Sequence, residues 1–162
     1  MEKSKLSLLP ISAKILVTCV VATLALGYSV SLLQVGNRGS FDSEKTIRHF
    51  RGSENPAESE VYVPQSDASM ISVAHVHSFS QPVVLAIMGF LFVLTAAAEF
   101  TKGFWILLSF LGSVSMNLSP WLIRDVSPSF VYGLYFGGAV MLGAFCVMAV
   151  RILYDLWMKK EA

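Results

Sequence analysis

The chain has 162 residues, of which 54% are hydrophobic and only 14% are charged, and its formal net charge is +1. Soluble domains usually carry about 25% charged residues, and the charges of this chain gather at the N-terminus and in residues 38–67. This pattern argues against a water-soluble fold and against a basic nucleic-acid-binding protein. The long uncharged runs between the charges predict an integral membrane protein.

Residues 15–34 are the first predicted membrane span. Lys14 and Arg38 bracket about 23 uncharged residues, enough to cross the hydrocarbon core of a bilayer. A cleavable signal peptide is the alternative, because lysines precede the run and Ala25-Leu26-Gly27 resembles a cleavage site. The apolar run continues as far as Leu33, which is too long for a typical signal core. We therefore favour an uncleaved anchor.

Residues 36–67 are predicted to form a polar loop outside the membrane. Ile47 and Phe50 lie three residues apart, which predicts a short amphipathic helix from Ser43 to Arg51. Gly52 should stop this helix, and the acidic, turn-rich residues 53–64 should be irregular.

The second span, predicted at residues 79–99, has two candidate starts. Ser66 is a good N-cap and Asp67 suits the first turn, so a helix could run from there to about Phe100. Alternatively, the membrane helix starts near Ser80, with Pro82 tolerated in its first turn.

Residues 103–123 and 127–150 are the third and fourth predicted spans. The links at residues 99–102 and 124–125 are so short that consecutive helices must be antiparallel neighbours. Ser119-Pro120 should break the third helix near its end, and Ser127-Pro128 should start the fourth. The predicted fold is a single all-α domain over residues 1–162, a four-transmembrane-helix bundle with one loop of about forty residues.

Small residues in the fourth span predict close helix packing. Gly133 and Gly137 are four residues apart, as are Ala139 and Gly143, and such spacings let helices approach closely. Packing inside the bundle is the simpler interpretation, and contact with a second copy or a partner subunit is the alternative. The two cysteines, Cys19 and Cys146, lie in apolar runs and are expected to be buried.

Basic residues near the span ends show a modest bias that predicts the orientation. One predicted side of the membrane carries more of these basic residues than the other, and it does not contain the acidic residues of the loop. The basic residues on this side are Lys3, Lys5, Lys14, Lys102, Arg151, Lys159 and Lys160. This bias predicts that both termini are cytoplasmic and that the loop lies outside.

The three histidines, His49, His75 and His77, all fall on the predicted outer side. A neutral imidazole is a good ligand for haem iron, copper or zinc, so haem b or a transition metal is the candidate cofactor. On a helix His75 and His77 would point about 200° apart and could not share one metal, whereas in an extended segment they could. The plainer interpretation is that they are interfacial polar groups.

The third span ends in polar residues that could line a pocket at the outer mouth of the bundle. Asn117, Trp121 and Arg124 are the candidate pocket residues, opposite Gln81 of the second span. Polar residues at membrane depth often mark function, although hydrogen-bonded helix packing is the commoner explanation. The sequence contains no recognisable catalytic set, which argues against an enzyme.

Three segments resemble a known group of small proteins. They are Arg48-His49-Phe50-Arg51-Gly52-Ser53-Glu54, Val63-Pro64-Gln65-Ser66 and Ala74-His75-Val76-His77-Ser78-Phe79-Ser80. This pattern resembles small four-span bacterial inner-membrane proteins with a His-x-His motif leading into the second span. The resemblance runs from about residue 36 to the end of the chain, and Gln65 stands where that group usually has a lysine. It implies the fold, the bacterial inner membrane and a candidate site, but no reaction.

The leading functional hypothesis is a non-catalytic subunit or accessory protein of a larger membrane complex, such as an electron-transfer chain. Its partners would be lipid and either other membrane subunits or a second copy. The alternative is a stand-alone haem- or metal-binding membrane protein that uses the outer-side histidines. A transporter or channel is less well supported, because no charged residue lies in the middle of a span.

Overall fold

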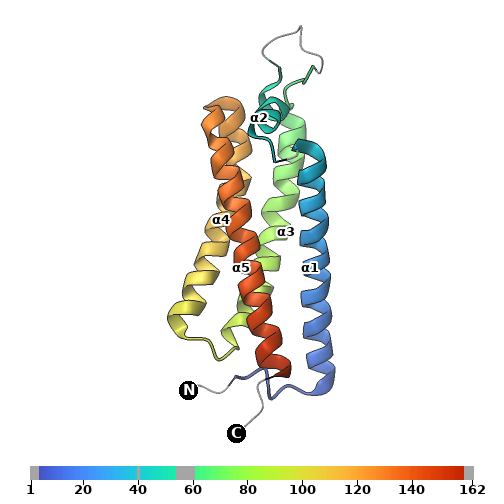
Figure 1. Ribbon diagram of the computed structural model, residues 1–162, viewed down its shortest axis with the longest axis vertical. Coiled ribbons are helices and arrows are strands. Elements are labelled where there is room, and N and C mark those ends of the chain that lie inside the picture. Colours follow the sequence, from blue (N-terminus) through green and yellow to red (C-terminus); the bar gives the residue numbers. More distant parts are fainter. Residues whose placement is uncertain (1–3, 40, 54–60, 159–162) are drawn as a thin grey trace.

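The computed structural model describes residues 4–39, 41–53 and 61–158. The helices in these ranges are α1 (Ile11–Gly39), α2 (Ser43–Arg51), α3 (Asp67–Val93), α4 (Glu99–Asp125), the 3-10 helix η1 (Pro128–Phe130) and α5 (Val131–Trp157). Four of these segments are long and apolar enough to cross a membrane. The short helix α2 lies across one end of the bundle, and the start of α1 and the end of α5 lie at the other (Figure 1). The predicted all-α, four-span bundle is confirmed, and we call its two ends the α2 end and the terminal end.

Helices α4 and α5 form the tightest pair of the bundle. A Cβ atom on Gly137 would lie 2.7 Å from the carbonyl oxygen of Gly112, so the two backbones are in direct contact. Nearer the α2 end, the Ser115 hydroxyl donates a hydrogen bond of 2.8 Å to the Gly133 carbonyl. Gly133 and Gly137 thus pack inside the bundle, whereas a Cβ atom on Gly143 would meet nothing within 4 Å.

Helix α1 packs on the rest of the bundle along a narrow strip. Of its described side chains only Val17 and Val21 are buried, and Tyr28 stacks on Phe145 with ring centroids 4.5 Å apart. Cys19 of α1 and Cys146 of α5 are both exposed, so the predicted burial of the cysteines is wrong. Lipid tails are as apolar as a protein core, so an apolar run in the sequence does not show which of its side chains face the bundle and which face lipid.

The link between the second and third spans lies earlier in the chain than predicted. Ser66 caps α3 as expected, accepting a hydrogen bond from the Ser69 N–H, but α3 ends at Val93 and not at Phe100. The predicted link at residues 99–102 is therefore wrong, because Glu99 already begins α4. Residues 94–98 form the turn although three of them are alanines, the best helix formers.

Distant contacts hold this turn. The Ala96 N–H donates a hydrogen bond of 2.5 Å to the Asp155 carboxylate, and the Lys5 N–H donates one of 3.1 Å to the Leu94 carbonyl. Since both partners are far away in the sequence, local helix propensity could not reveal where α3 ends.

Neither proline inside a span breaks its helix. Pro120 lies within α4, which continues to Asp125, so the predicted break at Ser119-Pro120 is wrong. Pro82 lies in the interior of α3, so no helix starts near Ser80. Neighbouring helices and side chains make proline tolerable in membrane helices. Ser127-Pro128 does open the fourth span, since the Ser127 hydroxyl caps η1.

The short amphipathic helix predicted at Ser43–Arg51 is confirmed as α2. It is fixed on α4 by a 3.1 Å hydrogen bond from the Arg51 guanidinium to the Ile123 carbonyl. It is fixed on α5 by a 2.8 Å hydrogen bond between the hydroxyls of Thr46 and Tyr135. The irregular segment predicted at residues 53–64 falls largely outside the described residues, which omit 54–60.

Gly52 ends α2 in a backbone conformation that only glycine adopts readily, with φ +87° and ψ 175°. A Cβ atom there would also lie 2.7 Å from the Pro64 ring. We expect Gly52→Ala to lower the free energy of unfolding of the α2 end by about 1.5 kcal/mol. Protease accessibility of α2 and thermal unfolding in detergent would measure this. Gly27→Ala is the control, because a Cβ atom there meets nothing within 4 Å, and equal behaviour of the two variants would contradict the prediction.

Candidate functional site

A cavity of about 380 Å³ lies at the α2 end, between α3 and α4 and under α2. Its polar lining residues come from all three of these helices and the segment before α3: His49, Gln65, Ser69, His77 and Asn117. The remaining lining residues are Phe50, Met70, Val73, Ala74, Met116, Pro120 and Trp121. None of these described lining residues is an aspartate, glutamate, lysine or arginine.

Helix periodicity explains which residues reach the cavity. Met70, Ala74 and His77 are four and then three residues apart, so they share one face of α3. Met116 and Pro120, also four apart, form the opposite wall on α4. The two methionines were not among the predicted site residues, and the spacing of Met70 with His77 is the signal that could have found them.

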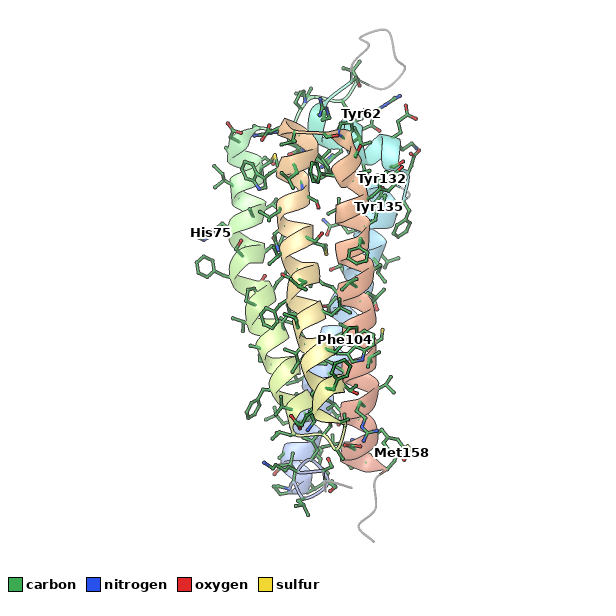
Figure 2. All side chains as sticks on the ribbon, turned by 90° about the vertical axis from the view of Figure 1, so that its left-hand side faces the viewer. Tyr62, His75, Phe104, Tyr132, Tyr135 and Met158 are labelled. Atoms are coloured by element: carbon green, nitrogen blue, oxygen red, sulfur yellow. The ribbon has the colours of Figure 1, made fainter. Side chains whose placement is uncertain are left out.

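The structure brings two of the three histidines to this cavity. His49 reaches it from α2 and His77 from α3. His75 is exposed, lies edge-on to Phe79 with ring centroids 5.1 Å apart, and points away from the other helices (Figure 2). The helical geometry therefore separates His75 from His77. Within the described residues no group of three or more His, Cys, Asp or Glu could hold a metal ion.

Some polar groups around the cavity have hydrogen-bond partners and others have none among the described residues. Gln65 contacts the His49 ring, with 3.4 Å between Nε2 atoms, and accepts a 2.8 Å hydrogen bond from the Ser69 hydroxyl. The His77 ring and the indole N–H of Trp121 have no hydrogen-bond partner among the described residues. The His77 side chain is exposed and that of Trp121 is half-buried, so both groups are accessible to a ligand that hydrogen-bonds to them.

The floor of the cavity is a hydrogen-bonded cluster that joins α3 and α4. The Asn117 amide donates 2.7 Å to the Gln81 carbonyl oxygen and 2.8 Å to the Ser113 backbone carbonyl. The Ser113 hydroxyl donates to the same Gln81 oxygen at 2.7 Å. Asn117 therefore takes part in helix packing as well as lining the cavity.

Arg124 does not line the cavity but fixes its rim. Its guanidinium donates 3.2 Å to the Gln65 backbone carbonyl and lies 5.3 Å from the centroid of the Trp121 ring. It also forms ion pairs with Asp67 at 2.6 Å and Asp125 at 2.8 Å. Two carboxylates thus neutralise the one guanidinium at the rim, which leaves it poorly suited to bind an anionic ligand.

A family model described as a transmembrane helical domain, Aq_1264_TM, matches residues 40–162. The match includes the whole of α2 to α5 and every residue that lines the cavity. Comparison with curated proteins and with solved structures finds no match.

Proposed function

We propose that this chain, which belongs to the family of Aq_1264_TM transmembrane helical domains, is a non-catalytic accessory protein of a larger membrane complex, such as an electron-transfer chain. The observation that carries the proposal is the unpacked face of α5. Ala139 and Cys146 are exposed there, and a Cβ atom on Gly143 between them would meet nothing within 4 Å. Small residues at such spacing allow a helix of a partner subunit to approach closely.

Purification in mild detergent followed by native mass spectrometry tests the accessory role. We expect another membrane subunit to copurify with the chain and to be lost in Gly143→Ile, which fills the open face. Gly27→Ile is the matched control, because Gly27 is likewise a helical glycine on which an added Cβ atom would meet nothing within 4 Å. A lone monomer, or an assembly of copies of this chain alone, would overturn the accessory role.

For the location, we propose the bacterial inner membrane with both termini in the cytoplasm and the α2 end outside. The start of α1 and the end of α5 lie at the same, terminal end of the bundle (Figure 1), as an even number of spans requires. The bias of basic residues supports the cytoplasmic side for that end. A reporter fused after residue 162 should be active only in the cytoplasm, and activity only outside would reverse the assignment.

A second candidate is a stand-alone haem- or metal-binding protein, favoured by the placement of His49 and His77 at one cavity. It predicts a Soret band or stoichiometric copper or zinc in the purified protein. The signal should be lost in His77→Ala and kept in His75→Ala, because His77 lines the cavity and His75 does not. Colourless protein that stays metal-free after loading with haem, copper and zinc would eliminate this candidate.

A further inference from the structure

We infer that the cavity at the α2 end binds an uncharged ring-shaped molecule from the membrane, with hydrogen-bond-accepting oxygens and an apolar tail, which is the chemistry of an isoprenoid quinone. The inference does not rest on the accessory role. It concerns the same cavity as the haem or metal candidate and names a different ligand class.

The charge of the lining selects an uncharged ligand. Among the described residues no carboxylate, ammonium or guanidinium lines the cavity, and the guanidinium at its rim, that of Arg124, is paired with Asp67 and Asp125. A lipid phosphate would therefore lack a free cation, and a divalent metal would lack an anionic ligand. An uncharged molecule needs neither a free cation nor an anionic ligand.

The size and polarity of the lining suit a single ring system. Small-molecule pockets measure roughly 300–1,000 Å³ and are mostly apolar with a few polar groups, and this cavity of about 380 Å³ is near the lower limit. Neither the His77 ring on α3 nor the indole N–H of Trp121 on α4 has a hydrogen-bond partner among the described residues, and each can donate an N–H to a ligand oxygen. A ring with carbonyl oxygens could accept a hydrogen bond from each of these two residues, while the methionine and phenylalanine side chains contact the faces of the ring.

The location gives such a ligand a route from the lipid. His77 lies ten residues into α3, or about 15 Å along a helix that is long and apolar enough to cross a membrane. Helix α2 and Gln65 lie across the end of the cavity, whereas Val73 on its α3 wall is 54% exposed. An apolar tail could therefore leave past α3 into the bilayer, as a membrane-dissolved quinone requires.

Fluorescence of Trp121 tests the inference directly. The chain has three tryptophans, and Trp105→Phe with Trp157→Phe leaves Trp121, in the cavity wall, as the only one. Decylubiquinone titrated into this variant in lipid nanodiscs should quench its emission saturably. His77→Leu should weaken the affinity about tenfold, since a ligand oxygen loses its donor, whereas His75→Leu should leave it unchanged.

Three outcomes would overturn the inference. The first is quenching that rises linearly with quinone and is equal in both histidine variants, which indicates partition into the lipid alone. The second is stoichiometric haem or metal that excludes the quinone. The third is saturable quenching in the parent that His77→Leu leaves unchanged, provided that both variants keep the parent's helical circular dichroism and unfolding midpoint. If His77→Leu fails to fold, His77→Ala, which also lacks a donor, replaces it and is judged by the same tenfold criterion.

Discussion

Replacement of Asp155 by alanine is expected to lower the free energy of unfolding by about 3 kcal/mol. Asp155 is completely buried near the end of α5, where its carboxylate accepts the Ala96 N–H and lies 3.2 Å from the Arg151 guanidinium. Removing it leaves the partly buried Ala96 N–H without an acceptor and Arg151 without its ion-pair partner. Because the Arg151 side chain is 35% exposed and can turn toward water, we expect the lower end of the usual cost of breaking a buried ion pair.

Unfolding in mixed micelles of a mild detergent and sodium dodecyl sulfate, followed by circular dichroism, would measure this loss. Asp155→Asn keeps an acceptor oxygen for the Ala96 N–H and should recover part of the stability. Glu44→Ala is the control: Glu44 forms an exposed ion pair with Arg48, and its loss should cost less than about 0.5 kcal/mol. If Asp155→Ala were as stable as Glu44→Ala, the carboxylate would not hold the turn.

The spans, the α2 helix and the caps of two helices could be predicted from the sequence because their signals are local. A long apolar run, a serine before a helix, or two apolar residues three apart act within a few residues of the chain. The turn at residues 94–98 could not be predicted in this way, because Asp155 is some sixty residues away. A lone carboxylate near the end of an apolar helix, four residues after Arg151, is the only sequence signal for it.

The candidate site was predictable in part for the same reason. Once α3 is helical through the His-x-His motif, the geometry of the helix separates His75 from His77. That His49 shares a cavity with His77, however, depends on how α2 folds over the bundle, which requires contacts between Arg51 and Ile123 and between Thr46 and Tyr135. Such contacts between distant segments leave no periodic signal in a single sequence.

Replacement of Gly137 by alanine is expected to lower the free energy of unfolding by about 2 kcal/mol. The new Cβ atom would lie 2.7 Å from the Gly112 carbonyl oxygen and 2.9 Å from the Met116 backbone nitrogen, and neither backbone atom can rotate away. Helices α4 and α5 would have to separate, at a cost of about 3 kcal/mol for overpacking, of which the better helix propensity of alanine returns about 1 kcal/mol.

Gly143→Ala measures the gain in helix propensity without any overpacking, because its Cβ atom meets nothing within 4 Å. That variant should be slightly more stable than the parent in the same mixed-micelle unfolding experiment, so the two alanines should shift the midpoint in opposite directions. A stabilised Gly137→Ala would show that α4 and α5 do not touch through their backbones. Since Met116 also lines the cavity at the α2 end, the separation forced by Gly137→Ala should displace one of its walls. Affinity for decylubiquinone should therefore fall together with stability in Gly137→Ala and remain unchanged in Gly143→Ala.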